Sequence, residues 1–344
     1  AQHCAQCHGA DRLGLMGPAL LPENLKRVRK KSAAKVIAEG RPATQMPPFG
    51  TLLDSDAVDA LVEMIYTPLP EIPVWTETQI EASRKILVAA ADLPEKPLHD
   101  ADPMNMFIVV ELGDHHASVL DGDRLEPIHR FKTQYAVHGG PKYSPDGRFV
   151  YFISRDGWVS KFDMWSLQTV AEVRAGINAR NLAVSDDGRY LMVANYLPHT
   201  LVLLDAEELR PVKLIDVHDD SGKSSRVSAV YTADPRHSFI AALKDIREVW
   251  EINYQKYPPR GFGEWMHDYR LESGENQAVK QFPVRRIRVK DYLDDFMFSQ
   301  DYVTLIGASR DGHGQVVDLD LGRVTHELDL PGMPHMASGI TWEY

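Results

Sequence analysis

Two stretches of this sequence repeat each other 41 residues apart, and this repeat limits the possible folds more than any other feature. One reads Tyr-Ser-Pro-Asp-Gly-Arg-Phe-Val-Tyr-Phe-Ile-Ser from Tyr143, and the other reads Val-Ser-Asp-Asp-Gly-Arg-Tyr-Leu-Met-Val-Ala-Asn from Val184. In each, a tight turn is followed by a run of β-branched and aromatic residues, which is the pattern of a strand. A unit of about 40 residues with four short strands is typical of a β-propeller blade.

Weaker copies of the unit begin near Asn105, Thr232 and Ser299, so the sequence predicts about five blades. One blade cannot bury both of its faces, and a propeller ring usually closes with about four to eight blades. Asp-Gly pairs at residues 146–147, 156–157, 187–188 and 311–312 are typical of the turns that join strands within a blade. The sequence stops in mid-pattern at Tyr344, and we expect further blades beyond it.

The N-terminus carries a second informative pattern, Cys4-Ala-Gln-Cys7-His8, which contains both cysteines of the chain. This spacing is typical of a covalently attached c-type haem, whose two thioether bonds use the thiols and whose iron binds the histidine. A disulfide or half of a zinc site would use the same thiols. However, the second cysteine pair of a four-cysteine zinc site is missing, and neither alternative requires His8. The motif therefore predicts heme c with His8 as an iron ligand.

A methionine downstream is the expected second ligand of that iron. Met46 lies in a loop rich in proline and glycine, residues 40–50, between helical patterns at 32–39 and 55–66. Such a loop holds the thioether outside a helix, and methionine ligation raises the haem potential. This order of helix, methionine loop and helix after a haem motif resembles a class I cytochrome c. The alternative ligands are His3, His99, His115 and His116.

Composition excludes several classes of protein. A chain of 344 residues is too long for one small cytochrome and fits two domains. Its net charge of −11 argues against a nucleic-acid partner. No stretch approaches the roughly 20 apolar residues that span a bilayer. The sequence begins three residues before Cys4, where a cytochrome c normally has a helix, so we expect the natural N-terminus to lie upstream.

Prolines divide the chain. They concentrate between about residues 68 and 102, where a helical segment is also expected at 77–91. After residue 103 the sequence pattern becomes one of short strands. We therefore expect an all-α cytochrome c domain at 1–70, an ordered linker at 71–103 and an incomplete all-β propeller at 104–344.

The haem motif followed by a propeller resembles the cytochrome cd1 family, whose eight-bladed propeller holds heme d1 on its axis. The resemblance runs from Cys4 to the end and is strongest over residues 134–205. Residues 135–138 read Tyr-Ala-Val-His, and residues 171–180 read Ala-Glu-Val-Arg-Ala-Gly-Ile-Asn-Ala-Arg; both are close to motifs of the family. The resemblance implies eight blades in the complete protein and heme d1, or its dihydro form, as a second tetrapyrrole.

Several residues acquire expected roles from this resemblance. His138 matches the histidine that is the proximal ligand of heme d1. Because heme d1 carries several carboxylates, it needs guanidinium partners that stay charged when buried, and we expect Arg155, Arg180 and Arg226 to supply them. The alternatives are structural salt bridges for the arginines and an ordinary loop histidine for His138. His335 resembles a histidine of the family's nitrite pocket.

The family contains at least two activities, and departures from the reductase pattern favour one of them. Nitrite reductases have Phe-Leu-His-Asp-Gly-Gly where this chain has Tyr-Leu-Asp-Asp-Phe-Met at 292–297, and His335 is followed by Met-Ala-Ser-Gly. The segment 257–281 also lengthens one connection. We therefore expect a dehydrogenase of heme d1 biosynthesis, which oxidises a propionate of dihydro-heme d1 to acrylate. The alternatives are reduction of nitrite to nitric oxide and a non-catalytic heme d1 carrier.

Removing hydrogen from a propionate requires a base, and His313 and His335 are the candidates because imidazole titrates near neutral pH. The electrons would pass to heme c and then to an external cytochrome or cupredoxin. The resemblance also implies a periplasmic location, because bacteria attach c-type haem there, and makes a transient complex with nitrite reductase plausible.

Overall fold

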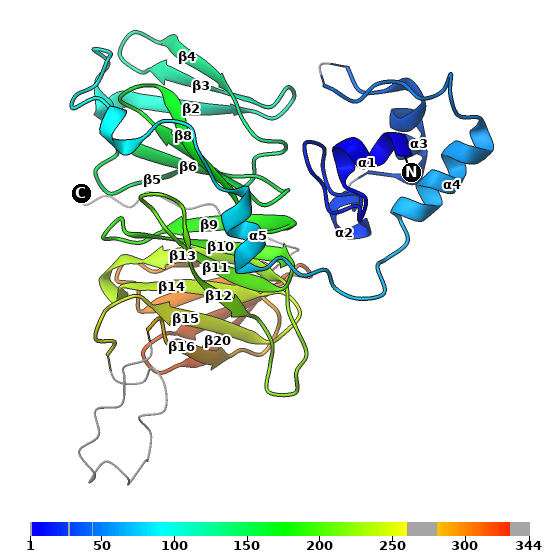
Figure 1. Ribbon diagram of the computed structural model, residues 1–344. Helices are drawn as coiled ribbons and strands as arrows, with labels where there is room; N and C mark the ends of the chain where they lie inside the picture. The colour runs from blue at the N-terminus through cyan, green and yellow to red at the C-terminus, as the bar shows by residue number, and fades with distance from the viewer. Residues whose placement is uncertain (1, 27, 43, 260–280, 331–344) are drawn as a thin grey trace. The chain divides into compact units, whose positions relative to one another are not determined.

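The computed structural model describes residues 2–26, 28–42, 44–259 and 281–330 (Figure 1). The chain divides into two compact units, which are considered separately below. Unit 1 comprises Ala1–Pro141 and Gly147–Ala179, and unit 2 comprises Lys142–Asp146 and Arg180–Tyr344.

Unit 1 begins with four helices, namely α1 (Gln2–His8), α2 (Pro22–Leu25), α3 (Lys30–Glu39) and α4 (Ser55–Ile65). The two predicted helices are confirmed as α3 and α4, within two residues at each end. Asp54 caps α4 by accepting a hydrogen bond from Ala57 N–H at 2.8 Å. Among the helices that the structure describes, none has the length and apolar character needed to cross a bilayer.

The segment predicted as a linker contains α5 (Glu77–Ser83), β1 (Lys85–Ile86) and the 3-10 turn η1 (Ala90–Asp92), and the 3-10 turn η2 (Pro103–Asn105) begins at its last residue. The helix predicted at 77–91 is therefore too long. Helix α5 begins with a capping box. The Thr76 side chain accepts a hydrogen bond from the backbone N–H of Gln79, and the Gln79 side chain accepts one from the backbone N–H of Thr76. The helix ends early because the chain after it pairs with an outer strand: Lys85 lies opposite Glu172 of β8. Pairing with this edge replaces the hydrogen bonds of the lost helical turns.

The rest of the chain consists of short antiparallel strands: β2 (Met106–Glu111), β3 (His116–Asp121), β4 (Glu126–Lys132), β5 (Lys142–Tyr143), β6 (Phe149–Ile153), β7 (Trp158–Asp163), β8 (Gln168–Arg174), β9 (Asn178–Val184), β10 (Tyr190–Leu197), β11 (Thr200–Asp205), β12 (Pro211–Asp216), β13 (Val227–Ala233), β14 (Ser238–Leu243), β15 (Glu248–Asn253), β16 (Val284–Arg288), β17 (Asp295–Phe298), β18 (Thr304–Ala308), β19 (His313–Asp318) and β20 (Arg323–Asp329). They form five sheets, with orders β2-β3-β4, β1-β8-β7-β6-β5, β9 to β12, β13 to β16 and β17 to β20.

Strand order equals chain order in every sheet, apart from the added β1, as expected for propeller blades. The described residues form five sheets, as many as the blade-like units predicted from sequence, and the number of blades in the protein stays a prediction. In Figure 1 the sheets β9 to β12 and β13 to β16 lie side by side. The insertion predicted at 257–281 falls between β15 and β16, and most of it lies outside the described residues.

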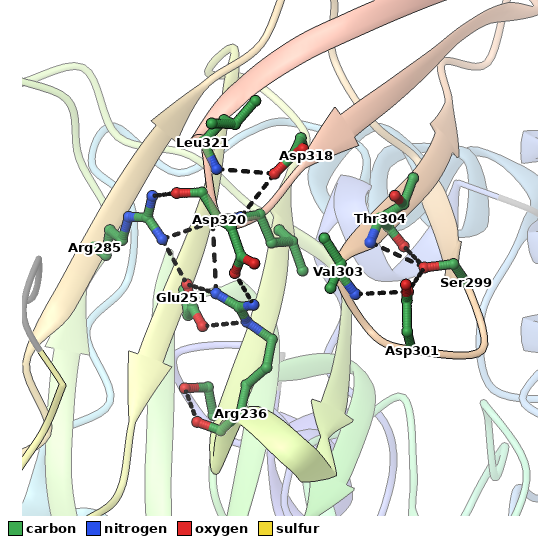
Figure 2. A network of polar contacts seen from close by, with 12 residues as sticks. Arg236, Glu251, Arg285, Ser299, Asp301, Val303, Thr304, Asp318, Asp320 and Leu321 are labelled. Carbon is green, nitrogen blue, oxygen red and sulfur yellow. Dashed lines mark hydrogen bonds and ion pairs between the residues drawn. The ribbon is translucent and has the colours of Figure 1, made fainter.

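The repeated Ser-x-Asp sequence builds the same turn in the sheet β9 to β12 and in the sheet β17 to β20. Ser185 donates to Asp187 at 2.7 Å, and Ser299 donates to Asp301 at 2.6 Å; the latter turn is drawn in Figure 2. The next residue has a positive φ in both turns, 69° at Gly188 and 57° at Tyr302. The side-chain bond thus fixes a left-handed turn even where glycine is missing, which explains why the copy near Ser299 is hard to recognise.

Apolar side chains from neighbouring sheets fill the space between them. Met192, Leu201 and Leu203 from one sheet pack with Phe239 and Ile252 from the next. Phe296, Leu305 and Val317 extend the same arrangement to the last sheet. Each blade therefore depends on its neighbours for burial of its faces.

A buried ion-pair network also joins the last two sheets (Figure 2). Glu251 on β15 is 1% exposed and accepts from Arg236 Nε at 2.8 Å and from Arg285 Nη1 at 3.4 Å. The two guanidiniums then reach the turn between β19 and β20, where Arg236 contacts the Asp320 carboxylate at 2.6 Å and Arg285 donates to Leu319 O at 2.6 Å. One carboxylate thus anchors two cations that hold the neighbouring blade.

We predict that Gly157→Ala destabilises the protein by about 2–4 kcal/mol, because alanine is strained at a φ of 81° and a Cβ would lie 2.0 Å from Gly176 O. Gly147→Ala is the matched control. Its φ is 72°, but a Cβ there meets nothing within 4 Å, so only the backbone cost of about 1 kcal/mol remains. Chemical denaturation of both variants measures the difference, and equal losses would contradict the steric argument.

Candidate functional site

Helix α1 arranges the haem motif. Cys4 and Cys7 are both free thiols, and their spacing of three places them one above the other on one helical face. His8 follows at the end of the helix and is 9% exposed. Its Nδ1 donates to the Pro18 carbonyl oxygen at 2.7 Å. Because Nδ1 then carries the proton, the lone pair is on Nε2, as iron ligation requires.

The loop after His8 packs against the imidazole ring of that residue. Gly17 donates its N–H to Cys7 O at 2.8 Å, and a Cβ at Gly17 would lie 2.9 Å from the His8 Cε1 atom. Gly14 donates to His8 O at 2.9 Å. A c-type haem is bound by two thiols and by an imidazole whose Nε2 carries the lone pair. These residues provide both, so they fit that group.

The Met46 loop closes on itself. Gly40 ends α3 with a φ of 72°, and Arg41 N–H donates to Met46 O at 3.0 Å. A Cβ at Gly40 would lie 2.7 Å from that same oxygen, so glycine permits the closure. Met46 remains the predicted sixth ligand. Two of the alternatives have other partners, since His99 Nε2 donates to Met164 O and His116 Nδ1 donates to Asp114 O, both at 2.9 Å.

His138 lies in the loop that enters the sheet containing β5 to β8. Its N–H donates to Ile153 O at 2.8 Å, and Arg155 N–H donates to Ala136 O at 3.0 Å. The structure thus brings the predicted iron ligand and the predicted carboxylate partner Arg155 together on paired segments. Ala136 has a φ of 50°, a left-handed conformation that reverses the chain just before His138.

In unit 2 as well, the loop that enters a sheet lies beside the turn that follows its second strand. In a sheet of antiparallel strands in chain order, the entry to the first strand and the turn after the second strand lie at the same end. Accordingly, Lys244 N–H donates to Arg226 O at 2.9 Å, and His313 contacts Asp291. In each of these sheets an entry loop and a turn therefore lie together. Arg155 and Arg226 lie in such segments, whereas Arg180 is the third residue of β9.

Four sheets share a polar position at or just after the end of their second strand. It lies eleven residues after the serine of the Ser-x-Asp turn, or after Asp234, and is occupied by Arg155, Tyr196, Asp245 and Arg310. Of these four residues, only Arg155 was predicted from the sequence. The sequence repeat could have revealed the other three residues, because aligning the repeated turns places them at the same position as Arg155.

Tyr196 is the centre of a cationic cluster in unit 2. The guanidinium of Arg180 lies 4.3 Å from the centroid of its ring, that of Arg226 lies 5.4 Å away, and Lys244 Nζ lies 5.9 Å away. Burial raises the pKa of Tyr196, against the opposing effect of Arg180 and Arg226, so the phenol stays protonated. Predicted residues Arg180 and Arg226 are thus brought to one ring.

Carboxylates neutralise part of this charge. Asp245 accepts from Arg226 Nη2 at 2.5 Å and Nε at 2.8 Å. Although burial favours the neutral carboxyl, these bonds keep the pKa of Asp245 below its usual value. Asp294 pairs with Lys244 and with Arg310 at 3.3 Å. Within the described residues, several cations therefore gather at one ring together with Asp245 and Asp294, and guanidinium groups suit a polycarboxylate ligand.

His313 occupies the first position of β19, on the turn after the second strand of its sheet. Its Nδ1 donates to Asp291 Oδ2 at 2.8 Å, so Nε2 holds the lone pair and points away from that bond. Burial favours the neutral form of Asp291, but the bonds from His313 and Tyr292 N–H outweigh it and lower its pKa. A carboxylate-oriented, exposed imidazole is suited to accept a proton. The other predicted base, His335, lies outside the described residues.

Comparisons with known proteins agree with this architecture. Residues 101–344 match the family described as cytochrome D1 heme domain, and residues 1–65 match cytochrome C oxidase, cbb3-type, subunit III. Dihydro-heme d1 dehydrogenase of Pseudomonas aeruginosa is 53% identical over 99% of this chain and 65% of its own length. Nitrite reductase of Stutzerimonas stutzeri is 24% identical over 99% of this chain and 61% of its own length.

A solved structure of dihydro-heme d1 dehydrogenase NirN in complex with DHE is also similar. It has a TM-score of 0.88 and 52% identity, over 99% of this chain and 69% of that one. The chain thus spans about two thirds of the length of these relatives. Because the matching family model covers most of the sequence, this chain belongs to the cytochrome D1 heme domain family.

Proposed function

We propose that this chain is part of a dihydro-heme d1 dehydrogenase, which oxidises a propionate of dihydro-heme d1 to acrylate in heme d1 biosynthesis. The main support is the 53% identity to such an enzyme along nearly the whole chain, against 24% to a nitrite reductase. The same proposal comprises a cytochrome c domain at 1–70, a linker at 71–103, a heme d1-binding propeller of eight blades from 104, and a periplasmic location.

The substrate would be held by its iron and its carboxylates. His138 would bind the iron, and Arg155, Arg180 and Arg226 would bind carboxylates, with Lys244 and Arg310 adding charge. The gathering of Arg180 and Arg226 at the Tyr196 ring supports this assignment, since guanidinium groups bind carboxylates in bidentate pairs.

The reaction converts CH2–CH2 of the propionate to CH=CH and releases two protons and two electrons. His313 Nε2 would accept one proton and solvent would take the other, while Asp291 would hold the imidazole in the required tautomer and stabilise its charged form. Heme c, held by Cys4, Cys7, His8 and Met46, would supply a one-electron acceptor when bound. The two electrons would therefore pass through it one at a time, each to an external cytochrome or cupredoxin. Nitrite reductase would receive the finished cofactor in a transient complex.

The deciding experiment supplies the full-length, haem-loaded protein with dihydro-heme d1 and an electron acceptor, and separately with nitrite and a reductant. We expect the macrocycle to lose two hydrogens, seen by mass spectrometry, and nitrite to remain. Turnover of nitrite without conversion of the macrocycle would identify a reductase. Stoichiometric binding with an unchanged side chain would identify a carrier.

We predict that Arg226→Met weakens dihydro-heme d1 binding roughly 10- to 100-fold, the loss expected for a hydrogen bond to a charged group. Arg189→Met is the matched control. Arg189 is also an arginine paired with an aspartate, Asp187. However, it precedes the first residue of β10, whereas Tyr196 lies near the last residue of that strand. Absorption titrations measure both affinities, and equal losses would show that the Tyr196 cluster has no special role.

A further inference from the structure

A buried polar group lies between the haem loop and the second sheet, entirely within unit 1. Arg174, the last residue of β8, is 3% exposed. It donates from Nη2 to Leu13 O at 2.6 Å, from Nη1 to Gly14 O at 3.1 Å and from Nε to Asp156 O at 2.9 Å. Its guanidinium also lies 4.7 Å from the centroid of the Trp75 ring. One side chain thus joins the loop behind His8, the linker and the turn that carries Asp156.

The Asp156 carboxylate, 7% exposed, faces the same loop. It accepts hydrogen bonds from Ala19 N–H and from the side chain of Asn24, while Asn24 also donates to Ile177 O at 3.3 Å. The charged group that faces it is Arg174 of β8, and Asp11 of the haem loop also interacts electrostatically with Arg174.

One peptide group connects this carboxylate to the haem ligand. The N–H of Ala19 and the C=O of Pro18 belong to the same peptide unit. Its N–H donates to Asp156, and its C=O accepts from His8 Nδ1 at 2.7 Å. Hydrogen bonds in series polarise one another, so negative charge at Asp156 makes Pro18 O a stronger acceptor. A stronger acceptor at Nδ1 makes the imidazole a more basic iron ligand.

We propose that Asp156 is a positioning residue that tunes the potential of heme c through the Pro18–Ala19 peptide and His8. The role of the potential in catalysis rests on the function proposed above, but the tuning itself does not. A more basic His8 stabilises the oxidised iron, so the ionised carboxylate lowers the potential and the neutral acid raises it.

The carboxylate changes charge in the physiological range. Burial raises the pKa of Asp156 to about 7, against the opposing effects of Arg174 and of the bonds from Ala19 and Asn24. Uptake of an electron by the haem and of a proton by Asp156 therefore favour each other. Because the dehydrogenation releases protons as well as electrons, such coupling assists electron acceptance at the lower end of this pH range.

The test is potentiometry of heme c in the full-length, haem-loaded protein without any second tetrapyrrole, from pH 5.5 to 8.5. We expect the midpoint potential of the wild type to fall as pH rises through about 7. Asp156→Asn should hold the potential near its acidic value and remove this fall. A pH-independent wild type, or an Asp156→Asn variant that keeps the fall, would overturn the proposal.

Two further variants separate tuning from damage to the fold. Asp163→Asn removes an equally buried carboxylate, paired with Arg148 at 3.0 Å at the other end of β7, and should keep the wild-type pH dependence. Loss of the dependence in this control would also overturn the proposal. Arg174→Met should move the fall to higher pH, because the cation lowers the pKa of Asp156. None of these potentials depends on whether dihydro-heme d1 is oxidised.

Discussion

His313→Gln should lower the rate of propionate oxidation by roughly 10²–10⁴-fold, the usual contribution of a general base. Glutamine has a similar length and can still donate to Asp291, but it cannot accept a proton at this position. The expected loss is in kcat and not in substrate binding, because His313 lies outside the Tyr196 cluster that we assign to the carboxylates. Single-turnover conversion of dihydro-heme d1, followed by absorption, measures the rate in the full-length protein.

Asp291→Asn provides the mechanistic control. It preserves the shape of the pair but no longer selects the tautomer with its proton on Nδ1 or stabilises the protonated ring. The rate should therefore fall in this variant as well, by less than in His313→Gln, while affinity for the substrate stays the same. If His313→Gln oxidises the propionate at the wild-type rate, the base lies elsewhere, and His335 becomes the leading candidate.

Glu251→Ala should destabilise the protein by about 3–5 kcal/mol, the cost of leaving buried charge without its partner. The carboxylate is 1% exposed and compensates two guanidiniums, Arg236 and Arg285, that hold the next sheet (Figure 2). Removing it leaves both cations among groups that were arranged for an anion. Chemical denaturation followed by tryptophan fluorescence measures the loss.

Asp320→Ala is the control within the same network. Asp320 also pairs with Arg236, at 2.6 Å, but its side chain is 60% exposed. Water can replace a partner at an exposed position, so this change should cost less than about 1 kcal/mol. Similar losses in the two variants would show that burial of Glu251 does not determine its contribution.

The features that were predictable from sequence are local ones. The haem motif depends on five consecutive residues, and α1 places Cys4 and Cys7 on one face as that spacing requires. Asp54 caps α4 because its side chain reaches a backbone N–H three residues on. The repeated turns follow the same logic, since Ser185 and Asp187 are close in the chain and bond each other. Short-range hydrogen bonds and steric limits determine these elements, and both can be read from neighbouring residues in the sequence.

Other features required segments that are far apart in the chain. The linker helix ends at Ser83 because β8, some 90 residues later, offers a strand edge, and no local signal announces it. Tyr196 looks like an ordinary strand residue until Arg180, Arg226 and Lys244 surround its ring.

Asp156 shows the same division most clearly. The sequence determined that Asp156-Gly157 forms a turn, because a left-handed glycine after aspartate is a local preference. Tertiary structure alone decided that its carboxylate is buried against Ala19 and Arg174, because burial and charge pairing depend on which distant surfaces the fold brings together.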